Sequence, residues 1–148
     1  MASANPLAST DQQAIADLTI TYAWTIDTRR FADLEQVFLS SATFEVGSGE
    51  RVLRGIDEIT AFISSVLTPL DASQHLVSNH QVRVDGDRAT CRCQLQAQHV
   101  RQGAEGGPNY IVAGHYDDVL VRTNSGWRIA ERHLTRTWTE GNTEVVAR

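Results

Sequence analysis

The sequence contains no lysine, because all 13 of its basic residues are arginine. This absence excludes Schiff-base chemistry, a lysine general base and a P-loop lysine that binds phosphate. Cysteine is nearly absent too, with only Cys91 and Cys93. If both lie on one strand they point to the same face, which is a poor geometry for a disulfide. We therefore expect two buried, reduced thiols and a protein of the cytoplasm.

Long apolar runs and an excess of positive charge are also missing. No apolar stretch approaches the roughly 18 residues of a membrane-spanning helix, and residues 1–13 lack the basic and apolar regions of a secretory signal. The net charge of −5 disfavours nucleic-acid phosphates as a partner. What is present is 148 residues, 41% of them hydrophobic, which suffices for one domain whose core could enclose a ligand cavity.

Apolar spacing predicts helices in the first half of the chain and strands in the second. Helices are expected from residue 11 to Asp27, over Phe31–Leu39 and over Ile56–Leu67. Strands are expected at 43–46, 51–55, 75–84, 88–101, 110–122 and 127–138. This order predicts an α+β fold with helices on one face of a curved antiparallel sheet. We expect one domain over residues 11–138, with flexible tails at 1–10 and 139–148.

The strand predicted at 88–101 has two distinct faces. One face is apolar and mostly small, and it ends with His99. Small side chains there leave space between the sheet and the helices, and a titratable ring on such a row needs a hydrogen-bond partner or a ligand. The opposite face is polar and carries Arg92, Gln94, Gln96 and Gln98. That row fits a solvated surface or a wet interface, and we expect a homodimer or larger homo-oligomer.

The titratable residues favour proton transfer over metal or cofactor chemistry. The sequence has no G-x-S-x-G, H-E-x-x-H, P-loop or dinucleotide-binding motif, and its histidines lack the spacing of metal ligands, so we expect no metal and no cofactor. Asp27 closes an apolar stripe of the first helix and so is expected to face the core. An aspartate beside a histidine fixes its tautomer and raises its basicity. Such a pair is suited to removing and returning a proton.

Four segments together resemble the SnoaL-like branch of the NTF2-like superfamily. They are AIADLTITYAWTID, VLRGIDEITAFI, SQHLVSNHQVRVDGDRATC and AGHYDDVLVRTNSGWRIAER. Each is weak alone, but their order and spacing resemble that family over nearly all of residues 11–138. The resemblance implies a cone-shaped fold, in which a strongly bent antiparallel sheet wraps around three N-terminal helices and encloses a deep hydrophobic pocket.

The resemblance also implies roles for particular residues. In dehydratase and dehydrochlorinase members, an aspartate that ends helix one pairs with a pocket histidine, and these positions match Asp27 and His75. A second pocket histidine of the dehydratase matches His99. The resemblance thus implies Asp27, His75 and His99 as catalytic residues, and we expect the substrate to be bound by Tyr22, Trp24, Tyr116 and Arg132. Tyr22 stands where the dehydrochlorinase has lysine, and Ile26 and Val46 stand where the dehydratase has tyrosines, so neither enzyme's own substrate is implied.

The expected activity is that of a cofactor-independent lyase or isomerase acting on a small hydrophobic or aromatic molecule, such as a polyketide or a steroid. Dehydration, double-bond migration and cyclisation are all compatible with these residues, with His75 or His99 as the base. A tyrosine or the other histidine would then protonate the leaving group or hold a developing oxyanion. The alternative is a module of the same fold that binds a small molecule, or assists an oxygenase, without catalysis.

Overall fold

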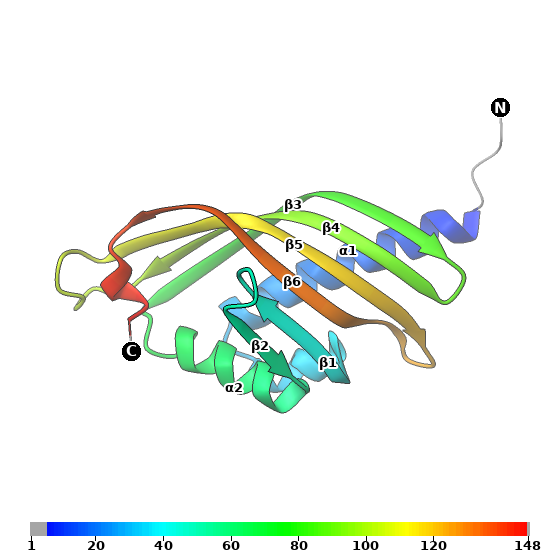
Figure 1. The fold of residues 1–148 in the computed structure, drawn as a ribbon, viewed down its shortest axis with the longest axis horizontal. Helices are drawn as coiled ribbons and strands as arrows, with labels where there is room; N and C mark the ends of the chain where they lie inside the picture. Colours follow the sequence, from blue (N-terminus) through cyan, green and yellow to red (C-terminus); the bar gives the residue numbers. More distant parts are fainter. Residues whose placement is uncertain (1–5, 148) are drawn as a thin grey trace.

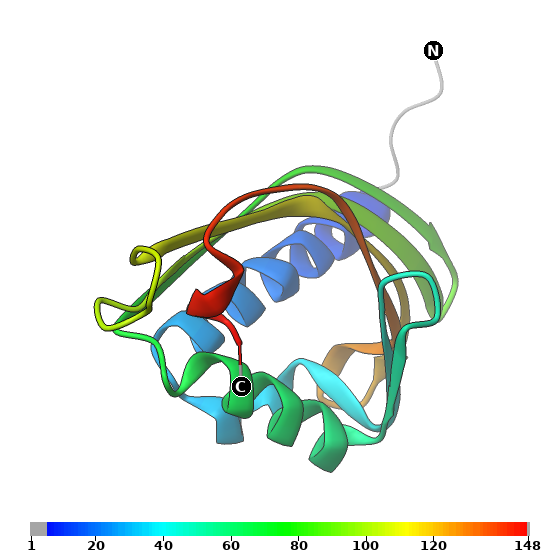
Figure 2. The same cartoon turned by 60° about the vertical axis from the view of Figure 1, so that its left-hand side comes forward.

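The computed structural model describes residues 6–147 as a six-stranded sheet that curls around its helices (Figure 1). In chain order the elements are α1 (Pro6–Asp27), the 3-10 helix η1 (Phe31–Gln36), β1 (Phe38–Val46), β2 (Arg51–Arg54), α2 (Ile56–Leu67), β3 (Ala72–Asp85), β4 (Arg88–Val100), β5 (Asn109–Thr123), β6 (Gly126–Gly141) and the 3-10 helix η2 (Thr143–Val145). The long α1 runs through the hollow of the sheet, and α2 lies across its open side (Figure 2). The predicted α+β cone is confirmed.

The sheet is mixed rather than purely antiparallel. Its order is β2-β1-β6-β5-β4-β3, and β1 pairs with β6 in parallel while every other pair is antiparallel. The antiparallel prediction is wrong at this one pair. In the meander from β3 to β6, the short turns make neighbouring strands antiparallel. No turn joins β1 to β6, so the sequence carries no local signal for the relative direction of these two strands.

Helix α1 buries one apolar stripe fully and the neighbouring one only in part. Ile15, Tyr22 and Ile26 are buried, as the spacing predicts. The neighbouring stripe is only partly buried, because Ile20 is 39% exposed. The helix ends at Asp27 in a Schellman-type cap, in which the Arg30 N–H donates to the Thr25 carbonyl and the Arg29 N–H donates to the Ile26 carbonyl.

A bulge in β3 reverses which residues face the core. His75 and Val77 point inward, whereas Leu76 is 54% exposed. The register shifts between Ser78 and Gln81, around Asn79 with its positive φ of 55°. After the shift the inward residues are Val82 and Val84. One extra residue therefore lets both halves of the strand bury apolar side chains, although their parities differ.

Both predicted tails contain regular structure. Residues 1–5 and 148 lie outside the described part of the chain, but α1 begins at Pro6, inside the predicted N-terminal tail. At the other end, β6 continues to Gly141 and η2 follows, where Val145 is almost completely buried. The expected flexible tail at 139–148 is therefore wrong for this packed segment. No helix in residues 6–147 combines the length and apolarity needed to cross a bilayer.

Candidate active site

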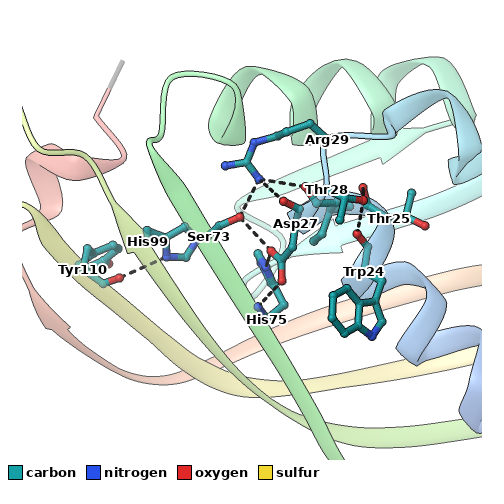
Figure 3. A network of polar contacts seen from close by, with 10 residues as sticks. Trp24, Thr25, Asp27, Thr28, Arg29, Ser73, His75, His99 and Tyr110 are labelled. Carbon is teal, nitrogen blue, oxygen red and sulfur yellow. Dashed lines mark hydrogen bonds and ion pairs between the residues drawn. The ribbon is translucent and has the colours of Figure 1, made fainter.

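Asp27 and His75 meet although 48 residues separate them in the sequence. Asp27 Oδ1 lies 2.7 Å from His75 Nδ1, and Oδ2 accepts a 2.7 Å hydrogen bond from the His75 backbone N–H (Figure 3). The carboxylate is placed at the last residue of α1 and the imidazole near the start of the edge strand β3. Because a carboxylate can only accept, the Nδ1 atom of His75 carries the hydrogen, and its Nε2 presents a lone pair.

Ser73 and Arg29 complete this network and were not anticipated from the sequence. Ser73 Oγ donates to Asp27 Oδ1 at 2.8 Å and accepts a 2.8 Å hydrogen bond from Arg29 Nη1. Ser73 lies two residues before His75 on β3, so both side chains point to the same face. This two-residue spacing could have identified Ser73 from the sequence, because it places the hydroxyl next to any group that hydrogen-bonds to His75.

Arg29 occupies the left-handed C′ position of the Schellman cap, where glycine is usual, with φ of 61°. Its side chain turns back over the helix end, and Nη1 also donates to the Ile26 and Asp27 carbonyls at 3.0 and 3.3 Å. These bonds satisfy carbonyls that the last turn of a helix leaves without partners. Arg29 thus joins the end of α1 to Ser73 on β3.

The network keeps Asp27 ionised. Burial alone would raise the pKa of its carboxyl, but the hydrogen bonds and charge of His75, with the Ser73 hydroxyl, outweigh burial and lower the pKa. A carboxylate held ionised beside an imidazole orients the ring and stabilises an imidazolium formed there. The Asp27–His75 pair can therefore act as a general base.

His99 lies next to this pair, as the face of β4 predicted. Its ring centroid is 5.7 Å from that of His75, with the rings nearly perpendicular. Its Nδ1 lies 3.3 Å from the Tyr110 backbone carbonyl, which can only accept, so Nδ1 carries the hydrogen (Figure 3). Burial, aided by the neighbouring His75, lowers the pKa of His99 to about 4. His99 is therefore neutral near pH 7 and offers a second Nε2 lone pair.

A cavity of about 220 Å³ opens between the concave face of the sheet and α2, and both histidines line it. An apolar protein cavity of roughly 150 Å³ holds benzene, so this one has room for a substituted ring. Aliphatic and aromatic side chains make most of its wall, namely Ile26, Phe44, Val46, Phe62, Ile63, Val66, Leu67, Leu95, Ala97, Val112, Leu134 and Val146. Its other polar groups are Tyr22, Tyr110, Tyr116 and Arg136.

Two of the four residues expected to bind substrate line the cavity, and two do not. Tyr22 and Tyr116 are in its wall. Trp24 is a correction, because its side chain is 66% exposed on α1 and is not among the residues that line the cavity. Trp24 lies three positions before Asp27 in α1, but the helix packs on the sheet through Tyr22 and Ile26, which turns Trp24 outward.

Arg132 is the second correction, because it lies behind the cavity wall and does not line the cavity. Its guanidinium is completely buried and makes a bidentate ion pair with Asp118, with both N–O distances 2.8 Å. It stands over the Tyr22 and Tyr116 rings, 4.3 and 4.0 Å from their centroids. Arg136, four residues later on the same face of β6, reaches the cavity instead and pairs with Glu50.

The remaining histidines and cysteines take part in other contacts. His80 Nε2 lies 2.6 Å from the Thr19 hydroxyl, and His133 Nε2 lies 2.9 Å from the Gly47 carbonyl. Burial raises the pKa of Cys91 to about 12 and that of Cys93 to about 11, so both remain protonated thiols. Within residues 6–147, no cluster of three or more histidine, cysteine or acidic side chains is arranged to hold a metal ion.

Comparison with known proteins identifies the family. Residues 8–133 match the model of the SnoaL-like domain. An uncharacterised protein of Mycobacterium tuberculosis is 37% identical over 131 residues, which cover 85% of each chain. The chain therefore belongs to the SnoaL-like family.

Solved structures show the same fold. A protein of Kribbella flavida has a TM-score of 0.86 at 28% identity, covering 94% of this chain and 99% of its own. A candidate scytalone dehydratase of Novosphingobium aromaticivorans has a TM-score of 0.81 at 22% identity, covering 90% and 88%. An NTF2-like superfamily protein of Salmonella enterica has a TM-score of 0.77 at 22% identity, covering 92% and 97%. The expected NTF2-like fold is confirmed.

Proposed function

We propose that this member of the SnoaL-like family is a cofactor-independent lyase or isomerase, in which His75 removes a proton from carbon of a small hydrophobic or aromatic substrate. The observation that carries the proposal is the Asp27–His75 pair, whose free Nε2 belongs to a ring lining an apolar cavity. A wall made mainly of apolar side chains lowers the local dielectric constant, which strengthens the electrostatic interactions between the pair and a bound substrate.

The reaction begins when His75 Nε2 takes a proton from a C–H bond that an adjacent electron-withdrawing group has acidified. The resulting imidazolium is stabilised by the ionised carboxylate of Asp27, 2.7 Å away. The electron pair of the C–H bond then forms a new double bond. In an elimination it expels a leaving group, which departs with the proton as water when the group is hydroxyl. In an isomerisation His75 returns the proton at another carbon.

His75 is the base of this scheme in preference to His99. Both rings present an Nε2 lone pair, but only His75 has a carboxylate to compensate the positive charge that it gains. The lowered pKa of His99 shows how costly that charge would be on its ring. His99 instead shapes the cavity and accepts hydrogen bonds from the substrate.

The test is a screen followed by chemistry. Thermal shift identifies ligands from a panel of aromatic, polyketide-like and steroid-like compounds, and NMR in D₂O then follows their conversion and their C–H exchange. His75→Ala and Asp27→Asn should each lower the rate by about 10²- to 10⁴-fold while the protein remains folded. His115→Ala is the matched control, because His115 pairs with Asp117 outside the cavity; it should retain full activity.

Two results would reject the proposal. One is full activity in both the His75 and the Asp27 variants. The other is ligand stabilisation with neither conversion nor proton exchange for any compound that binds. The second result would favour a non-catalytic module that binds small molecules in the same cavity.

A further inference from the structure

The neutral rings of His75 and His99 offer the cavity only hydrogen-bond acceptors. The Nδ1–H groups of His75 and His99 are used by Asp27 and by the Tyr110 carbonyl, which leaves a lone pair on each Nε2. A ligand oxygen that only accepts, such as a ketone oxygen, therefore finds no donor on either neutral ring. Any donor for such an oxygen must come from another part of the cavity wall.

Tyr22 and Tyr116 form a second polar centre in that wall. Their rings meet edge to face, with centroids 5.9 Å apart, and the two hydroxyls interact with each other. Both side chains are almost completely buried, and burial raises the pKa of each phenol, so both keep their hydrogens. Tyr22 comes from α1 and Tyr116 from β5, so the pair closes the space between helix and sheet.

The Tyr22–Tyr116 pair has at least one O–H donor that no protein group uses. Two phenols supply two O–H groups, and a hydrogen bond between them would use only one. In the described residues neither hydroxyl has a protein acceptor other than the second tyrosine, because Arg132, the charged group beside them, can donate but cannot accept. One O–H group is therefore left without an acceptor from the protein, and both tyrosines line the cavity.

Arg132 makes this centre electropositive. Two nitrogens of its guanidinium bind Asp118, but Nη1 is buried without a hydrogen-bond partner in the described residues. The cation stands against both tyrosine rings and interacts with the Tyr22 hydroxyl. A cation behind a phenol polarises its O–H bond and stabilises negative charge on an oxygen that accepts from it.

We propose that the Tyr22–Tyr116 pair, backed by Arg132, binds the carbonyl oxygen of the substrate, so that the substrate class is small aromatic or alicyclic ketones. This inference rests on the proposed function, because it names the acidifying group beside the C–H bond that His75 attacks. Loss of that proton turns the ketone into an enolate, whose oxygen gains the negative charge. The tyrosine O–H and Arg132 stabilise that oxygen, and the proton stays on His75 Nε2 until it is returned.

The experiment measures binding, so it does not depend on turnover. The probes are acetophenone and α-methylstyrene, which have the same planar shape and differ in one atom, the carbonyl oxygen being replaced by CH₂. Dissociation constants are measured by calorimetry for the wild-type protein, Tyr22→Phe and Tyr116→Phe. Each variant should raise the constant for the ketone about tenfold, the typical effect of one buried hydrogen bond, and that for the hydrocarbon less than twofold.

Tyr110→Phe is the matched control, because Tyr110 also lines the cavity but is not part of the pair. It should not produce a loss selective for the ketone. The proposal is overturned if the Tyr22 and Tyr116 variants weaken both probes equally, or if the selective loss appears in Tyr110→Phe instead. If the Phe variants do not fold, the infrared carbonyl stretch of acetophenone bound to the wild type decides. It should fall to lower frequency than in an apolar solvent, and an unshifted band overturns the proposal.

Proton exchange separates this inference from the proposed function. Asp27→Asn should bind acetophenone like the wild type but lose exchange of its methyl hydrogens in D₂O. Ketone binding that depends on the tyrosines, without exchange in the wild type, would support the ketone site and count against His75 as its base. Exchange with no selective effect of the tyrosines would support the base and overturn the ketone site.

Discussion

The neutral state of His99 predicts how the stability of the folded protein depends on pH. Burial lowers the pKa of this ring from 6.5 to about 4. Between those two values the unfolded chain binds a proton that the folded protein does not. Stability therefore falls as the pH decreases through 6.5, and the loss is complete only below about 4.

The size of the effect follows from the shift. The full shift corresponds to about 3 kcal/mol of folding free energy. Between pH 7 and pH 5 most of the unfolded chain becomes protonated at this ring while little of the folded protein does, so about 2 kcal/mol is lost in that interval. His80, whose pKa burial also lowers, contributes in the same direction. The contribution of His80 cancels when the wild type is compared with a variant at His99, because both proteins contain His80.

The assay is urea unfolding at both pH values for the wild type and His99→Asn. The asparagine amide can donate to the Tyr110 carbonyl in place of Nδ1–H, but it does not titrate. Between pH 7 and pH 5 the wild type should lose about 2 kcal/mol more stability than the variant. Equal losses in the two proteins would refute a buried, neutral His99. An NMR titration of the His99 ring gives a direct check, since it should remain neutral at pH 5.

Variants at Arg29 and at the Arg132–Asp118 pair test the structural supports of the site by urea unfolding. Arg29→Gly and Arg29→Ala both remove the guanidinium, but only alanine keeps a side chain at a φ of 61°, so Arg29→Ala should be the less stable by about 1 kcal/mol; equal stability would contradict the left-handed cap. Asp118→Ala leaves Arg132 as an uncompensated buried charge and should cost about 3–5 kcal/mol, whereas the double change Asp118→Leu with Arg132→Met should cost less than half of that. A double variant as unstable as the single one would refute the reasoning.

The parts of the site that local periodicity controls could be predicted from the sequence. The inward position of His99 follows from alternation along β4, which is a regular strand without a bulge. The position of Asp27 at the end of α1 follows from the helical pattern and from the break after it. Helix α2 has the boundaries that its apolar spacing predicts. In each case the residues that carry the signal are neighbours in the sequence.

What could not be predicted depends on contacts between distant segments. The face of α1 that packs on the sheet decides whether Trp24 points inward, and the helix alone offered two apolar stripes. The burial of Arg132 depends on Asp118 across the β5–β6 pair, so an arginine that we expected to bind substrate lies behind the cavity wall. In β3, one extra residue near Asn79 changes which alternate residues face the core, and no turn motif in the sequence indicates this bulge.

Two opposite charges, those of Asp27 and Arg132, stand behind different parts of the cavity wall. Proton transfer from carbon separates charge, because the base becomes positive and the substrate oxygen becomes negative. In an apolar cavity each new charge is costly unless an opposite charge is already in place. Asp27 stands behind His75, and Arg132 stands behind the Tyr22–Tyr116 pair, although Asp118 offsets part of its charge. The arrangement therefore opposes one direction of charge separation far less than the other. In the reaction that we propose, a ketone binds with its C–H bond toward His75 and its oxygen toward the tyrosines.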